Sequence, residues 1–301
     1  MYRDINQISE DFFRGYAENA VVKLGLGDAL LFRRTNPSEI ECTIYCPLAC
    51  FILQGAKEVQ SGDISVNCPA DYSIIVSHEL PVQSQIIKAT LDQPYIALIL
   101  PLDIGLLRGF YEEMPDFVDI DAKAEALLSF PSDSGLRDAV ARLLTIVRDG
   151  QTSSLLGPII LKELHARLML SPQGAILRRF LRRDDPSNHV ARAISSIRDT
   201  ISDPLSIPAL AERAGMSRSS FHAHFKSVTG LTPGQYQKDI RLTEAHRLIN
   251  DSSLTITSIA FEVGYESPAQ FSRDYGAKFG RSPRDARKSD STESVLRASV
   301  F

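Results

Sequence analysis

The sequence predicts an α+β protein. We expect an N-terminal β-barrel with flanking helices, then an all-α domain in which a long helix joins two helix-turn-helix motifs. Three observations predict this fold class. Residues 41–100 alternate short apolar runs with turn residues, residues 102–180 carry apolar side chains at helical spacing, and residues 207–284 contain two copies of one pattern. A chain of 301 residues is long enough for two domains that each bury a substantial hydrophobic core.

The N-terminal domain is expected to span residues 1–180. Its first segment, residues 5–31, has a pattern of apolar residues that favours one or two helices. Seven strands bounded by turn residues are then expected at residues 41–46, 48–53, 57–60, 64–67, 72–76, 83–89 and 95–100. Many short strands at this spacing are typical of a small barrel or double-sheet roll, which encloses space for a small ligand near its middle.

Helical periodicity returns after Pro101. Helices are expected at residues 102–111, 134–148, 155–170 and 173–182. The second of these carries a single apolar stripe, formed by Leu136, Val140, Leu143, Leu144 and Val147. The sequence leaves open whether such helices cover the barrel or pair two subunits. A charged connector at residues 181–188 precedes the second domain, and the Ser/Thr-rich residues 289–301 are expected to form a disordered tail.

Residues 189–288, the expected second domain, contain an internal repeat. The matched pairs are Ala211/Ala260, Gly215/Gly264, Ser217/Ser267, Phe221/Phe271 and Gly230/Gly280. Each copy predicts a helix-turn-helix, at about residues 207–229 and 256–279, because glycine can take positive φ in the sharp turn and serine caps the second helix. The repeat makes two equivalent units the central feature of the chain.

The second helix of each copy has an apolar face and a polar face. The apolar faces contain Phe221, Phe225, Val228, Phe271 and Tyr275. Opposite them lie short, polar or cationic residues, which suit a helix that enters the major groove of DNA: Ser219, His222, Ala223, Lys226, Ala269, Ser272, Arg273 and Gly276. One such face would be interpreted as ordinary solvated surface, but two at one repeat length favour DNA recognition.

A helix without an internal breaker is expected at residues 233–250, between the two copies. Eighteen helical residues extend roughly 27 Å. Successive major-groove faces of B-DNA repeat about every 34 Å. Two recognition helices separated by this rod are therefore expected to bind one side of a duplex together.

Residues 189–288 resemble the DNA-binding domain of the AraC/XylS family of bacterial transcription regulators. The resemblance rests on the segments Ala260-Phe-Glu-Val-Gly-Tyr-Glu-Ser-Pro-Ala-Gln-Phe-Ser-Arg273 and Phe279-Gly-Arg-Ser-Pro283. It implies that positions on both recognition helices face the bases, namely Ser219, His222, Ala223, Ala269, Gln270 and Arg273. The complete expected DNA-binding set is Arg218, Ser219, His222, Ala223, Lys226, Ala269, Gln270, Ser272 and Arg273.

The strand region resembles the cupin-like N-terminal domain of one AraC-type subgroup. This resemblance rests on Phe51-Ile-Leu-Gln-Gly-Ala-Lys57 and Pro94-Tyr-Ile-Ala-Leu98. It implies a cupin-like β-barrel that senses a small effector. The candidate effector-binding residues are Ile52, Gln54, Tyr72, Ile74 and His78. By analogy with the family, we also expect a homodimer.

Charge is distributed unevenly along the chain. Residues 1–188 have a net charge of −7 and residues 189–288 of +4, so positive charge lies where phosphates would be contacted. The sequence pI of about 5.9 argues against a non-specific nucleic-acid coat. No apolar run is long enough for a membrane helix and the N-terminus has no signal-peptide profile, so we expect a cytoplasmic protein without a membrane partner. The four cysteines are expected to be free thiols.

An enzyme is the less favoured interpretation. Metal-dependent cupins use clustered histidines with a carboxylate, but His78 is the only histidine in the strand region. No phosphate-binding glycine loop or paired nucleophile and base is recognisable. We therefore expect no catalytic residue, no metal site and no cofactor.

The expected function is sequence-specific transcription regulation, with promoter binding modulated by a small-molecule effector in the N-terminal domain. Arg273 would contact a base edge, Ser219, His222 and Gln270 would assist, and Lys226 would contact a phosphate. The expected partners are double-stranded promoter DNA, an effector, a second copy of the chain and, for an activator, RNA polymerase. Two alternatives remain: a non-specific architectural DNA-binding protein, and a cupin-type metalloenzyme fused to a helical domain.

Overall fold

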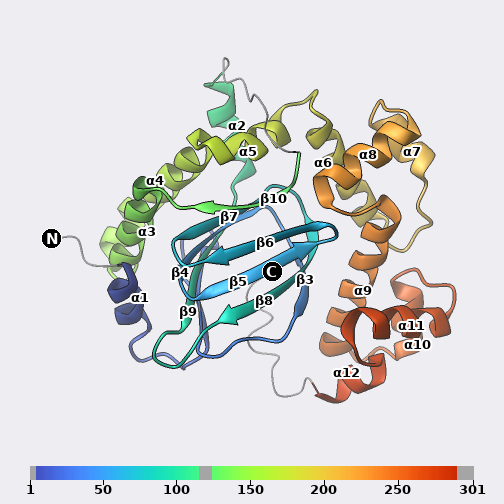
Figure 1. Ribbon diagram of the computed structural model, residues 1–301, viewed down its shortest axis with the longest axis horizontal. Helices are drawn as coiled ribbons and strands as arrows, with labels where there is room; N and C mark the ends of the chain where they lie inside the picture. Colours follow the sequence, from blue (N-terminus) through green and yellow to red (C-terminus); the bar gives the residue numbers. More distant parts are fainter. Residues whose placement is uncertain (1–4, 115–123, 290–301) are drawn as a thin grey trace.

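The computed structural model describes residues 5–114 and 124–289. Two β-sheets occupy the middle of the molecule, with α1–α5 along one side and α6–α12 along the other (Figure 1). The tail expected at residues 289–301 lies outside the described residues from position 290 onward. Among the described residues, no helix is both long and apolar enough to cross a membrane.

The strands pair entirely antiparallel, in two sheets. One sheet contains, in spatial order, β1 (Ala20–Lys23), β2 (Leu30–Arg34), β9 (Tyr95–Pro101), β4 (Leu48–Gln54), β7 (Tyr72–Val76) and β10 (Leu127–Pro131). The other contains β3 (Glu41–Tyr45), β8 (Leu80–Lys88), β5 (Ala56–Ser61) and β6 (Ile64–Pro69). The structure confirms the seven strands predicted between residues 41 and 100. They were predictable because turn residues bound each of them.

The expectation of one or two helices in residues 5–31 is wrong beyond the first helix. Only α1 (Ile5–Phe13) is helical, and β1 and β2 follow as an antiparallel pair. Gly15, Gly25 and Gly27 all take positive φ, which ends helical structure and allows the tight connections. Leu31, fully buried, then pairs with Leu98 of β9, so tertiary pairing decides the conformation of this segment.

The expectation that residues 102–180 are wholly helical is also wrong at one place. Strand β10 pairs with β7 along its whole length, and Leu127 and Phe130 are buried. Five residues are too few to show a period that separates a strand from a short helix.

The helices of the N-terminal domain pack on the outer face of the six-stranded sheet. They are α2 (Ile104–Glu112), α3 (Ser134–Ile146), α4 (Gly150–Leu170) and α5 (Ala175–Leu181), with a short 3₁₀ turn at Pro172–Gly174. Leu136, Val140 and Leu143 of α3 join Phe51 and Leu98 of the sheet in one buried cluster. The apolar stripe predicted on α3 therefore covers the sheet.

The C-terminal domain contains the two predicted helix-turn-helix units. Its helices are α6 (Pro186–Asp199), α7 (Ile207–Arg213), α8 (Arg218–Thr229), α9 (Pro233–Asp251), α10 (Ile256–Glu262), α11 (Pro268–Phe279) and α12 (Pro283–Ser289). Helix α6 begins inside the expected connector, where the Asp185 side chain accepts a hydrogen bond from the Ser187 N–H and caps it. The irregular link between α5 and α6 is consequently only residues 182–185.

Hydrophobic packing joins the first helix-turn-helix to the sheets. Ile52 and Ile74 between the sheets belong to the same buried cluster as Ile194 of α6, Phe225 of α8 and Tyr236 of α9. The second unit has its own cluster, which is built around Ala260, Phe271 and Tyr275. The first unit is therefore docked on the N-terminal domain, whereas the second is attached through α9.

Candidate nucleic-acid interface

Helix α8 is positioned by its two ends and by its buried face. The Ser217 hydroxyl accepts a hydrogen bond from the Ser220 N–H at 3.2 Å, and Gly230 ends the helix in the left-handed conformation with φ of 77°. Phe221 and Phe225 are fully buried beneath it. The predicted DNA-binding residues of this helix are all exposed: Arg218, Ser219, His222, Ala223 and Lys226.

Helix α11 repeats this arrangement in the second unit. Ser267 caps it, Pro268 occupies the first turn, and Phe271 and Tyr275 are fully buried. The predicted DNA-binding residues on this helix are also exposed: Ala269, Gln270, Ser272 and Arg273. Both helices thus present their polar faces to solvent, and a role for each residue in DNA binding stays a prediction.

Helix α9 holds the two units in a fixed relationship. Its 19 residues correspond to about 28 Å; α8 packs near its N-terminal end at Tyr236, and α11 packs farther along it, between Lys238 and His246 (Figure 1). The Arg241 guanidinium of α9 donates to two carbonyl oxygens, that of Ile201 in the α6–α7 loop at 2.7 Å and that of Gly264 in the turn of the second unit at 2.9 Å.

Two ion pairs fix α11 on α9. Lys238 of α9 lies 2.7 Å from Asp274, and Lys278 of α11 lies 2.8 Å from Asp239. The direction of the second recognition helix is therefore set by α9.

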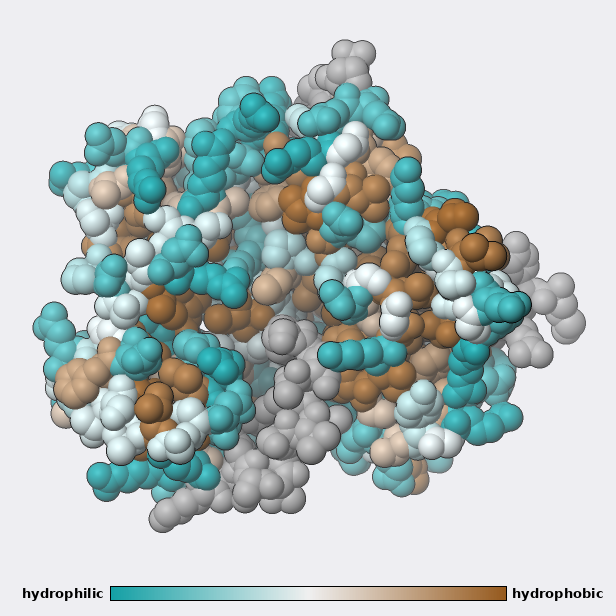
Figure 2. All heavy atoms as spheres, turned by 180° about the vertical axis from the view of Figure 1, so that it is seen from behind, coloured by the Kyte–Doolittle hydropathy of each residue, from teal (hydrophilic) through white to brown (hydrophobic). Residues whose placement is uncertain are grey.

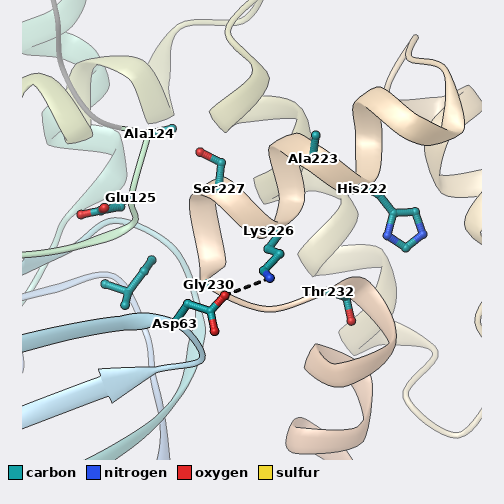
Figure 3. Close-up of a pocket in the computed structure, with 10 residues that line it drawn as sticks. Asp63, Ala124, Glu125, His222, Ala223, Lys226, Ser227, Gly230 and Thr232 are labelled. Carbon is teal, nitrogen blue, oxygen red and sulfur yellow. Dashed lines mark ion pairs between the residues drawn. The ribbon is translucent and has the colours of Figure 1, made fainter.

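The C-terminal half of α8 faces the N-terminal domain across an open cleft of about 850 Å³. Its walls are Asp63, Ile64, Ala124 and Glu125 on one side and His222, Ala223, Lys226, Ser227, Gly230 and Thr232 on the other. Figure 3 shows Lys226 reaching from α8 to Asp63, whose carboxylate lies 2.9 Å from the Lys226 Nζ, while His222 projects on another side of the helix.

Two hydrogen bonds, one of them between backbone groups, hold the β5–β6 turn, Ser61 to Asp63, against the end of α8. The Asp63 N–H donates to the Gly230 carbonyl at 3.1 Å, and the Ser61 hydroxyl donates to the Thr229 carbonyl at 3.0 Å. A Cβ built on Gly62 would come within 2.2 Å of the Gly230 carbonyl oxygen. Glycine at this position permits the close approach of the two backbones.

The predicted effector-binding residues lie in different environments. Ile52 and Ile74 are fully buried between the sheets, and Tyr72 is half-buried at the start of β7. The Gln54 Nε2 is buried and has no hydrogen-bond partner among the residues that the structure describes. His78 lies instead at the link to α6, so the structure brings Ile52 and Ile74 together but places His78 elsewhere. Effector binding by these five residues stays a prediction.

His78 is hydrogen-bonded through both ring nitrogens. Its Nδ1 lies 2.8 Å from the Ser77 hydroxyl and its Nε2 lies 2.9 Å from the Ser187 carbonyl oxygen, while the ring packs edge-on against Phe180. Burial lowers the pKa of His78 to about 4, although the Ser187 carbonyl opposes this shift.

Sequence reasoning missed a buried polar pair between the sheets. The Lys57 Nζ donates to the Tyr45 hydroxyl at 2.7 Å and also lies over the Tyr45 ring. The available signal was strand alternation, because Lys57 shares the inward parity of Val59. Asp63 and Glu125 were also missed, since only the fold brings them opposite α8. Among the described residues, no group of three potential metal ligands gathers closely enough to hold an ion.

Comparisons with known proteins cover both domains. Residues 27–176 match the family model of the AraC-type transcriptional regulator N-terminus, and residues 210–289 match a helix-turn-helix domain model. The transcriptional activator RhaS of Escherichia fergusonii is 35% identical over 101 residues, which are 34% of this chain and 35% of RhaS. The match therefore spans about a third of that relative.

Longer matches extend across the two domains. The transcriptional regulator ExsA of Pseudomonas aeruginosa is 25% identical over 195 residues, which are 64% of this chain and 69% of ExsA. The solved structure of ToxT from Vibrio cholerae has a TM-score of 0.57 at 13% identity, covering 86% of this chain and 97% of ToxT. ToxT bound to an unsaturated fatty acid has a TM-score of 0.52 at 12% identity, covering 90% and 96% respectively. These structural likenesses show a shared fold.

Proposed function

The chain belongs to the AraC family of transcriptional regulators, and we propose from this premise that it regulates transcription by binding promoter DNA sequence-specifically under the control of a small-molecule effector. One observation carries the proposal: two equivalent recognition helices, α8 and α11, are both held by α9 and present exposed polar faces. Binding, not catalysis, is the activity that we assign to the chain.

In this proposal α8 and α11 enter successive major-groove segments on one side of the duplex. Arg273 donates to a base edge, because its guanidinium is exposed on the outer face of α11 and can form two parallel hydrogen bonds to guanine. Ser219, His222 and Gln270 add further contacts to bases, and Lys226 contacts a phosphate.

The effector binds between the two sheets in this proposal. Ile52 and Ile74 supply apolar surface there, and Gln54 supplies an amide whose Nε2 is unpaired within residues 5–114 and 124–289. The match to the AraC-type N-terminus and the fold shared with ToxT, which has been solved with an unsaturated fatty acid bound, support a small-molecule effector. The ligand changes how the N-terminal domain packs on α8 and thereby changes DNA affinity.

A homodimer and a cytoplasmic location complete the proposal. Apolar side chains are exposed on α4: Leu155 at 74%, Leu156 at 46% and Ile159 at 62%. Figure 2 shows apolar atoms at the surface along the edge where α1, α3 and α4 lie. A second copy packed on this face would cover it. RNA polymerase is the further partner if the protein activates transcription.

Selection from a randomised duplex library tests the function. We expect enrichment of a site with two half-elements, and competition at fixed salt should show at least 1,000-fold preference for this site over random duplex, on the order known for specific regulators. Equal affinity for selected and random duplexes would instead identify a non-specific architectural protein.

A further inference from the structure

We propose that the β5–β6 turn, Ser61 to Asp63, is an autoinhibitory contact in which Asp63 holds the phosphate-binding lysine of α8 until DNA displaces it. The inference rests on the proposed DNA binding by α8 and adds a regulatory element to it. Lys226 is the residue that both Asp63 and a DNA phosphate would bind. Its ammonium lies 2.9 Å from the Asp63 carboxylate.

A phosphate and Asp63 compete for the same ammonium group. Both are anions, and a phosphate bound at Lys226 would lie within a few ångströms of the Asp63 carboxylate, where like charges repel. Glu125 lines the same cleft and adds to this repulsion. A DNA phosphate can therefore contact Lys226 only if the β5–β6 turn is displaced. If the turn stays in place, DNA binds without this phosphate contact.

Hydrogen bonds to backbone carbonyls hold the two domains together at this contact, in addition to the ion pair between the Asp63 and Lys226 side chains. The Asp63 N–H and the Ser61 hydroxyl bond the last two carbonyls of the α8 region, at Gly230 and Thr229. A third bond runs from the Ala126 N–H to the Val228 carbonyl at 2.8 Å. These bonds place Asp63 opposite Lys226 whichever rotamers the two side chains adopt.

The other end of the hairpin lies where the effector is proposed to bind. Val59 of β5 and Cys68 of β6, which lie away from the turn, belong to the same buried cluster as Ile52 and Ile74. A ligand that changes the packing between the sheets therefore moves the strands that carry Asp63. Effector occupancy and release of Lys226 are coupled through this hairpin.

A charge-matched pair of variants tests the proposal. Asp63→Asn removes the competing anion and keeps the bond from the residue 63 N–H to Gly230. Glu58→Gln removes an exposed carboxylate from β5, the strand before the turn, where the side chain faces away from the interior. Affinity for the selected duplex is measured by fluorescence anisotropy as a function of salt. We expect about two- to five-fold tighter binding for Asp63→Asn than for Glu58→Gln, the scale of an exposed ion pair.

Two further readouts separate competition from a general charge effect. The slope of log affinity against log salt should steepen by about one in Asp63→Asn, because one more phosphate contact releases a counterion. In a Lys226→Ala background, Asp63→Asn and Glu58→Gln should have equal effects. Equal affinities of the two single variants, or an Asp63→Asn gain that persists without Lys226, would overturn the autoinhibitory contact.

These outcomes are distinguishable from failure of the function itself. If no duplex is preferred over random DNA, sequence-specific binding fails whatever Asp63 does. If the selected site is preferred but Asp63→Asn behaves like Glu58→Gln, the function stands and the autoinhibitory contact is rejected.

Discussion

His78 and Ser187 connect the end of β7 to the first turn of α6 by a buried hydrogen bond, with the His78 Nε2 at 2.9 Å from the Ser187 carbonyl oxygen. A carbonyl oxygen can only accept, so Nε2 carries the proton and Nδ1 accepts from the Ser77 hydroxyl at 2.8 Å. Burial lowers the pKa of His78 to about 4, so the ring is neutral at pH 7 where the two domains meet. Protonation would place a charge in a buried site, which burial disfavours more strongly than Asp185 favours it.

This neutral histidine predicts a loss of stability in acid. Burial lowers the pKa of His78 from 6.5 to about 4, so its stabilising contribution is complete above pH 6.5 and declines as the pH falls toward 4. Between pH 7.5 and 5 the wild type should lose about 2 kcal/mol more unfolding free energy than His78→Gln. Urea unfolding at both pH values measures this difference, and parallel losses in the two proteins would contradict it.

The two turn glycines predict unequal effects of one substitution. Gly215 and Gly264 occupy equivalent positions with φ of 65° and 86°. A Cβ on Gly215 would meet no described residue within 4 Å, whereas one on Gly264 would approach the Ser202 carbonyl oxygen to 2.3 Å. Gly215→Ala should cost about 1–2 kcal/mol from backbone strain alone. Gly264→Ala should cost at least roughly 1 kcal/mol more because of the added overlap. Denaturant unfolding that ranks them in the opposite order would refute this packing.

The exposed apolar face of α4 predicts a dimer that charge disrupts. A Leu155→Lys, Ile159→Lys double variant should sediment as a monomer at concentrations where the wild type is a dimer, because two charges cannot be buried without partners. Leu91→Lys is the control, since Leu91 is 60% exposed in the turn before β9. A monomeric wild type, or a double variant that still dimerises, would exclude α4 as the subunit interface.

The Lys57–Tyr45 pair predicts non-additive energetics. Tyr45→Phe removes the only hydrogen-bond acceptor that the Lys57 ammonium contacts among the described residues, and it should cost about 1–3 kcal/mol of unfolding free energy. Combining it with Lys57→Met should restore much of this loss, because both polar groups are then absent. Additive losses in the double variant would show that the two side chains act independently.

The sequence predicted the C-terminal domain more completely than the N-terminal one. Local turn and cap geometry depends on residue types that the sequence shows directly, namely Gly215, Gly264, Ser217 and Ser267. Because the same pattern occurs twice, each copy supports the prediction made for the other. Strand β2 was missed because its conformation depends on pairing with β9, which is distant in sequence.

The site was also only partly predictable. The exposed faces of α8 and α11 follow from helical periodicity, whereas the pair formed by Asp63 and Lys226 joins residues 163 positions apart. No local pattern encodes such a contact. His78 was expected at the effector site from the resemblance to the cupin-like N-terminal domain, but its partner Ser187 becomes visible only once α6 is docked.

Base recognition by Arg273 is the most direct test of the proposed function. Arg273→Ala should weaken binding to the selected duplex by about 1–3 kcal/mol and binding to random duplex much less. Arg192→Ala removes an exposed positive charge from α6 of the same domain, and it should weaken binding to the selected and the random duplex slightly and equally. Competition binding at fixed salt measures all three proteins. An equal loss on selected and random DNA for Arg273→Ala would contradict sequence recognition by α11.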